Sequence, residues 1–144
     1  MGKFYTSKGA KDVTTSSWSE PEDSEKDYNG MPVSKLRTIC AEFKVDSAFV
    51  KAAPTTKTYR IVENSATTLK ILCVNRTRDI PYCDTFDVED LLLVRAIKPN
   101  SQCCVVQIGI NYVWHKSTMM KGMIKSGAEK EARAMNADYI KLLQ

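Results

Sequence analysis

The chain has 144 residues, the length of one domain, and its 43% hydrophobic content is enough to build a buried core. The formal net charge of +4 is compatible with an anionic membrane surface or a nucleic acid, but it is too small to require either. No segment has the pattern of a signal peptide or of a membrane-crossing helix. The five cysteines lack a CxxC pair, which favours structural thiols in a reducing compartment over a disulfide framework.

Runs of β-branched and alternating apolar residues predict six strands. These strands span residues 11–18, 36–45, 55–63, 67–76, 83–97 and 102–114. Val13 and Trp18 are the expected apolar anchors of the first strand, and residues 19–30 are an acidic loop. In the sixth strand every even position from Cys104 to Trp114 is apolar, so one face of that strand is expected to face the interior.

A long amphipathic helix is predicted after the sixth strand. Ser117 is a favourable N-cap, and the helix is expected to run almost to Gln144. Apolar or small residues recur along one face at Met120, Ile124, Ala128, Ala132, Met135, Tyr139 and Leu142. The order of elements therefore predicts an α+β domain, a meandering sheet closed by a C-terminal helix, which suits a protein that holds a molecule in a cavity.

The connection at residues 46–54 has an unusual apolar content for a loop. Phe49 and Val50 lie there beside Lys51, and leaving such a large apolar group in water forgoes about 1.5–3 kcal/mol. Two interpretations stay open. Either the two side chains fold back into the core, or they form a lid that dips into a membrane while Lys51 meets anionic headgroups.

A proline-marked break at residues 78–86 separates the fourth and fifth predicted strands. Five carboxylates gather around this break: Asp79, Asp84, Asp87, Glu89 and Asp90. Paired carboxylates can perform acid–base chemistry. We favour a structural role, in which Asp79 and Asp84 organise the turn by accepting hydrogen bonds from nearby backbone N–H groups.

Few residues suggest catalysis or a cofactor. His115 is the one histidine in the sequence, so a His-rich metal site is excluded, and we interpret it as a strand-end residue. The cysteines lie in predicted strands without an activating context. Phosphate-binding glycine loops, nucleophile elbows and the aromatic–basic pattern of RNA-binding modules are missing. We therefore expect no enzyme activity, no cofactor, no metal and no nucleic-acid partner.

Several segments together resemble the VASt domain, the StART-like lipid-transfer module of the Lam, Aster and GRAM-domain proteins. The resemblance covers nearly the whole chain: Trp18, the LRTI of residues 36–39, the FVKAAP of residues 49–54, the DIPYCDTF of residues 79–86 and the helix start in residues 114–125. These segments are similar to the family's GPK loop, its DVPYxDxF signature and its W…K…KG-I-E pattern. Two departures are visible. Phe49 and Val50 stand where the family has Gly-Pro, and the family's first helix is expected to be missing from residues 1–144.

The resemblance implies a StART-like helix-grip fold, a curved antiparallel sheet of about six strands packed on a long C-terminal helix, with a sterol-sized cavity between them. It implies non-enzymatic binding and transfer of a sterol, or of another single lipid, by a monomeric domain of a larger membrane-anchored protein. The implied location is the cytosolic face of membranes at endoplasmic reticulum–plasma membrane contact sites. An empty cavity of about 500 Å³ would cost about 12 kcal/mol, so an isolated container is expected to be filled, partly wet or collapsed.

On this basis we expect a lid made by Phe49, Val50 and Lys51, which also meets an anionic membrane. The expected cavity-lining residues are Ile108, Ile110, Tyr112, Met120, Met123 and Ile124. Two alternatives remain on the same fold. One is a module that recruits a membrane or a partner without transferring lipid. The other is a small-molecule enzyme of the cyclase or hydrolase type, which would need His115 and Asp84 to point inward.

Overall fold

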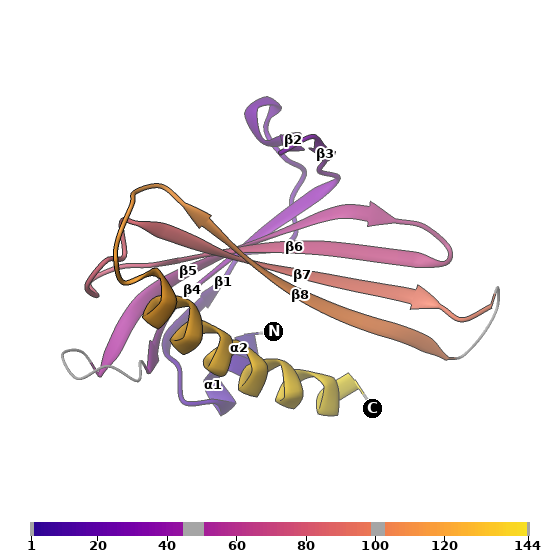
Figure 1. The fold of residues 1–144 in the computed structure, drawn as a ribbon. Helices are drawn as coiled ribbons and strands as arrows, with labels where there is room; N and C mark the ends of the chain where they lie inside the picture. Colours follow the sequence, from indigo (N-terminus) through magenta and orange to yellow (C-terminus); the bar gives the residue numbers. More distant parts are fainter. Residues whose placement is uncertain (1, 45–50, 99–102, 144) are drawn as a thin grey trace.

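The computed structural model describes residues 2–44, 51–98 and 103–143. Within these residues six strands form one antiparallel sheet in the order β1-β4-β5-β6-β7-β8 (Figure 1). The strands are β1 (Lys11–Thr15), β4 (Lys35–Lys44), β5 (Ala52–Asn64), β6 (Thr68–Thr77), β7 (Phe86–Ala96) and β8 (Cys104–Trp114). The predicted α+β fold, a meandering sheet with a C-terminal helix, is therefore confirmed.

The two helices and a small β-arm lie on opposite faces of this sheet. Helices α1 (Gly2–Ser7) and α2 (Lys121–Leu143) cover the face that we call the inner face (Figure 1). The arm consists of a 3-10 turn, Asp23–Glu25, and the short strands β2 (Asp27–Tyr28) and β3 (Met31–Pro32), and it covers the outer face. Because side chains alternate along a strand, each long strand contributes to both faces.

The register aligns the inner-face residues of β5, β6, β7 and β8 in rows across the sheet. One row joins Tyr59, Cys73, Asp90 and Ile110, which are successive partners on β5, β6, β7 and β8. The row on one side of it joins Lys57, Asn75, Val88 and Tyr112. The row on the other side joins Ile61, Ile71, Leu92 and Ile108. Polar and apolar side chains therefore share this face.

The fully buried core lies at the β4–β6 side of the inner face, where α1 covers the sheet. Tyr5 from α1 packs there with Ile39, Tyr59 and Cys73, all of which are at most 7% exposed. The hydroxyls of Tyr5 and Tyr59 form a hydrogen bond with each other. Two residues from the C-terminal half of α2, Met135 and Tyr139, pack against the same cluster. The predicted apolar helix face is confirmed there, and its members Ile124, Ala128 and Ala132 are also partly buried.

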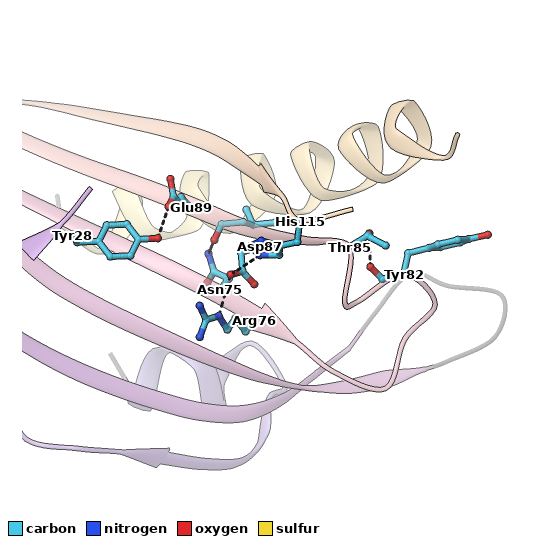
Figure 2. Close-up of polar contacts among 9 residues, drawn as sticks. Tyr28, Asn75, Arg76, Tyr82, Thr85, Asp87, Glu89 and His115 are labelled. Atoms are coloured by element: carbon cyan, nitrogen blue, oxygen red, sulfur yellow. Dashed lines mark hydrogen bonds and ion pairs between the residues drawn. The ribbon is translucent and has the colours of Figure 1, made fainter. Parts of the chain in front are cut away.

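The β-arm is fixed to the outer face by polar contacts. The Tyr28 hydroxyl donates to Glu89 Oε1 at 2.6 Å (Figure 2). The Arg60 guanidinium lies 4.7 Å from the centre of the Tyr28 ring. Asn111 Nδ2 donates to the other carboxylate oxygen, Glu89 Oε2, at 3.0 Å. Burial raises the pKa of the Tyr28 phenol to about 12, and its bond to Glu89 adds to this. Glu89 is thus a structural carboxylate that holds the arm.

Several predicted boundaries were wrong. The first strand ends at Thr15, and Trp18 is 38% exposed with its ring under the Arg37 guanidinium, so it is not a buried anchor. β5 begins at Ala52, which places Ala52, Ala53 and Pro54 in a strand and not in the loop. Helix α2 begins at Lys121 and not after Ser117. Neither α1 nor the arm was predicted from the sequence.

Candidate functional site

The inner face of β7 and β8 has an apolar surface that the rest of the protein covers only in part. Leu92 on β7 pairs with Ile108 on β8, and Asp90 pairs with Ile110. All four side chains are partly buried, in contrast to Ile39, which is 0% exposed in the core on the same face. Val94 and Val106 extend the apolar surface by one more pair, again partly buried. This half-covered apolar surface is the candidate site.

Helix α2 borders this surface through its first turns. The Tyr112 hydroxyl donates to the Lys125 carbonyl oxygen at 3.2 Å, which joins β8 to the helix. Burial raises the pKa of the Tyr112 phenol, and the carboxylates of Glu129 and Asp90 add to the shift. Tyr112 also stacks on Trp114, with ring centres 6.2 Å apart. The aromatic residues therefore border the half-covered surface where α2 begins.

A bridged polar cluster lies in the middle of the inner face. Asn75 is its centre: its Oδ1 accepts a hydrogen bond from Lys57 Nζ, and its Nδ2 donates to Asp90 Oδ2 at 2.8 Å. Burial raises the pKa of the neighbouring Cys73 thiol to about 12, so this thiol stays neutral and is a poor nucleophile. The sequence analysis did not single out Lys57 or Asn75. The signal that would find this cluster is the strand register, because its members come from three different strands.

Three connections meet at one end of the sheet, because β4, β6 and β8 end where β5, β7 and α2 begin. Arg78 N–H donates to the Pro54 carbonyl at 2.9 Å, which joins the break after β6 to β5. His115 N–H donates to the Thr85 carbonyl at 2.8 Å, which joins the segment after β8 to the β6–β7 connection. We call this the basic end, after its exposed cationic residues Lys51, Arg78, Lys116 and Lys121. Large apolar side chains are exposed there as well: Tyr82 is 46% exposed, Met119 is 102% and Met123 is 66%.

The sequence profile of the VAD1 Analog of StAR-related lipid transfer domain matches residues 1–131. The chain belongs to the VASt family. A C2 and GRAM domain-containing protein of Arabidopsis thaliana is 24% identical over 147 residues. That alignment covers 97% of this chain and 14% of the plant protein, so the chain spans only a small part of the length of this relative.

The VASt family is a StART-like family of lipid-binding domains, and the fold fits that class. A curved antiparallel sheet lies over a long C-terminal helix (Figure 1), and the register places the half-covered apolar surface on the face that the helix covers. Within the described residues, no helix is long and apolar enough to span a membrane.

The predicted lining residues of this VASt domain fall into two groups. Ile108, Ile110 and Tyr112 lie on the inner face by register, beside Leu92, Asp90 and Val88. Met120 and Ile124 are partly buried at the start of α2, whereas Met123 is largely in solvent. Of the predicted lid, Lys51 is exposed at the basic end, and Phe49 and Val50 lie outside the described residues. Their roles in ligand binding stay predictions.

The proline break is a turn held mainly by backbone contacts and Thr85. The Thr85 N–H and Oγ1 both donate to the Tyr82 carbonyl, at 3.0 and 2.7 Å (Figure 2). Tyr82 has a φ of 66°, a left-handed conformation that is unusual for a bulky residue. Asp84 mainly contacts Lys116, whose hydrogen bond lowers the pKa of that carboxyl. Thr85 thus holds the turn directly, and Asp84 combines its contact with Lys116 with a backbone hydrogen bond, so the organisation of the turn by Asp79 and Asp84 stays a prediction.

The residues required by the enzyme interpretation are not brought together. His115 Nε2 lies 3.2 Å from Asp87 Oδ2 on the outer face, and Arg76 Nε lies 3.0 Å from the same oxygen (Figure 2). Asp84 is at the surface in its ion pair with Lys116. Two shallow hollows lie elsewhere, one of about 560 Å³ beside α1 and β1 and one of about 490 Å³ along β4 and β5. The half-covered apolar surface thus remains the feature that best fits a lipid-binding domain.

Proposed function

We propose that this VASt domain binds one lipid molecule, a sterol or a lipid of similar size, on the inner face of β7 and β8 beneath α2, and transfers it between membranes. The observation that supports this most is the half-covered apolar surface formed by Leu92, Ile108 and Ile110. Covering apolar surface is worth about 25 cal/mol per Å², so a lipid that covers these side chains gains a favourable contact that the lipid-free protein lacks.

The basic end is the proposed site of lipid exchange with an anionic membrane. Lys51, Arg78, Lys116 and Lys121 give it cationic character, and Asp84 neutralises only Lys116 among them through a described ion pair. Each lysine or arginine near an anionic membrane surface contributes about 1 kcal/mol. Met119 and Tyr82 add exposed apolar groups that fit the boundary between headgroups and acyl chains. Phe49, Val50 and Lys51 are proposed to act as the lid at this end.

We further infer that the domain works within a larger, membrane-associated protein on the cytosolic side, at contacts between the endoplasmic reticulum and the plasma membrane. The support is the family together with the plant relative, whose sequence is much longer than this chain and whose name includes a GRAM domain. No catalytic step is part of the proposal, because the family is a lipid-binding one and the inner face lacks an activated nucleophile among the described residues.

The test is lipid extraction from sedimentable liposomes, combined with native mass spectrometry of the purified domain. We expect a one-to-one complex with sterol and transfer of the sterol to acceptor vesicles. Lys51→Glu is expected to slow transfer from anionic vesicles by about fivefold, and to leave transfer from neutral vesicles nearly unchanged. Lys35→Glu, an exposed residue at the start of β4 and so at the end of the sheet opposite the basic end, is the matched control.

Two outcomes would count against this function. A folded domain that extracts neither sterol nor phospholipid does not transfer lipid. If that domain still binds anionic vesicles, it is a recruiting module on the same fold. Equal effects of Lys51→Glu on anionic and neutral vesicles would show that Lys51 is an ordinary surface lysine.

A further inference from the structure

The polar cluster of the inner face has an acceptor that no described group satisfies. Asp90 Oδ1 is buried and has no hydrogen-bond partner, whereas its second oxygen, Oδ2, accepts from Asn75. Buried carboxylate oxygens are normally paired, because an unpaired one loses its hydration without replacement. The orphaned oxygen therefore needs a donor that arrives from outside the described residues.

Asn75, the hydrogen-bond partner of Asp90, has no donor left to give. Asn75 Nδ2 uses its two hydrogens on Asp90 Oδ2 and on the Val88 carbonyl, at 2.8 and 3.0 Å. The Cys73 thiol points to Asn75 Oδ1, with the two atoms 3.6 Å apart. Lys57 donates to the same Asn75 oxygen, and its ammonium also lies 5.7 and 5.4 Å from the ring centres of Tyr5 and Phe43. The cluster thus keeps one acceptor without a described donor, Asp90 Oδ1.

The cluster borders the half-covered apolar surface directly. Asp90 pairs with Ile110 on β8, and the next inner-face positions on the same strand are Val88 and Leu92. A lipid on the inner face of β7 and β8 would therefore lie against apolar side chains and reach Asp90 with one polar end. The opposite charges of Lys57 and Asp90, joined through Asn75, leave the cluster without net charge.

We propose that Lys57, Asn75 and Asp90 are a head-group subsite for a lipid with a neutral hydroxyl. This inference rests on the proposed function, since it assigns the polar end of the same lipid. The hydroxyl donates its hydrogen to Asp90 Oδ1, while Asn75, which Lys57 holds, fixes the other carboxylate oxygen. A phosphate group would instead bring negative charge against Asp90, and an ammonium group would bring positive charge towards Lys57. The subsite therefore selects neutral alcohols over charged lipids.

A matched pair of probes tests this directly: a sterol with a 3-hydroxyl group, and the same sterol oxidised to the 3-ketone, which can only accept hydrogen bonds. Both are offered to the full chain in neutral phosphatidylcholine vesicles, and equilibrium binding is measured. We expect the wild-type protein to bind the alcohol about tenfold or more tightly than the ketone, because a ketone leaves Asp90 Oδ1 unpaired. This comparison needs no variant, so it does not depend on how a substitution folds.

The variant Asp90→Asn provides a second test, because it can replace the unpaired acceptor with an amide donor. In this variant the preference for the alcohol is expected to disappear or to invert in favour of the ketone. Asp87→Asn is the control, since Asp87 lies on the same strand but its carboxylate contacts Arg76 and His115 on the outer face. The control should keep the preference for the alcohol.

The outcomes separate this inference from the proposed function. If the wild-type protein binds neither sterol nor any other lipid, the proposed function fails, and this subsite fails with it. If it binds alcohol and ketone equally well, lipid binding stands and the subsite is refuted. Tight binding of the alcohol with an unchanged preference in Asp90→Asn would also refute the role of Asp90, provided that the variant unfolds at the wild-type temperature.

Discussion

The half-covered apolar surface leads to a prediction that separates a lining residue from an ordinary core residue. Ile39 and Ile108 both lie on the inner face of the sheet. Ile39 is 0% exposed beneath α1, whereas Ile108 is only partly buried on β8. We therefore compare Ile39→Ala with Ile108→Ala, which remove the same three carbon atoms from the two environments.

The two sites should differ strongly in stability. Three carbons are worth about 2.4 kcal/mol of transfer free energy, at about 0.8 kcal/mol each. At Ile39 the cost of the enclosed cavity adds to this transfer free energy, so the free energy of unfolding should fall by about 2–5 kcal/mol. At Ile108 part of the side chain is already in water and solvent can fill the space, so the lipid-free protein should lose about 1 kcal/mol or less.

For lipid binding we expect the opposite ranking, with a larger effect of Ile108→Ala than of Ile39→Ala. If a lipid covers Ile108, the carbons removed by Ile108→Ala no longer contact it, and binding should weaken by about 1–2 kcal/mol, or roughly fivefold to thirtyfold. Ile39→Ala should leave the affinity of the folded protein nearly unchanged. Urea unfolding of delipidated protein and equilibrium sterol binding measure the two quantities. Two results together would show that Ile108 is an ordinary core residue: both variants lose the same stability, and Ile108→Ala weakens sterol binding only as far as its larger unfolded fraction explains.

Two further predictions concern the contacts that attach α1 to the rest of the fold. Tyr5→Phe and Tyr59→Phe should each lower the free energy of unfolding by about 1–3 kcal/mol, because each removes the hydrogen bond between the two buried hydroxyls, and the double variant should lose less than the sum; additive losses in urea unfolding would contradict this. Lys8 donates to Asp138 of α2 at 2.5 Å and holds the pKa of that carboxyl below its ordinary value of 3.8. The pair should therefore add stability that is fully present above pH 3.8 and is lost as the pH falls through the lower folded-state pKa. Asp138→Asn should remove that part of the pH dependence in thermal unfolding, and an unchanged acid profile would show that the ion pair contributes nothing.

The long strands and α2 could be predicted because their patterns extend over many residues. β8 alternates apolar residues along most of its length, and α2 repeats its apolar face through Tyr139. The arm was missed although Asn29-Gly30, a strong hairpin signal, lies between β2 and β3. Its strands have two residues each, and its main contact joins Tyr28 to Glu89, far away in sequence. Helix α1 has six residues, too few for local propensity to specify it, and it depends on the contacts of Tyr5.

The candidate site could be predicted only in part, because it depends on which residues share a face. The alternation of β8 was enough to place Ile108, Ile110 and Tyr112 on one side of the sheet. The carboxylates of β7 looked like one cluster in the sequence, but the strand separates them. Glu89 holds the arm on the outer face, and Asp90, the next residue, lies on the inner face. Only the register between strands shows that Asp90 meets Asn75 and, through it, Lys57.

The uneven burial of the inner face also has a physical rationale. A closed, empty cavity of sterol size would cost about 12 kcal/mol, which is comparable to the whole stability of a typical domain. In this structure the core is concentrated at one side of the inner face, around Ile39 and Tyr59, and the other side, at Ile108 and Ile110, is left partly in contact with solvent. The inner face then has two features that a ligand can satisfy, the partly exposed apolar area and the unpaired Asp90 Oδ1. A hydroxyl-bearing lipid would satisfy both at once, and by mass action it would stabilise the folded domain by an amount that rises with the free lipid concentration.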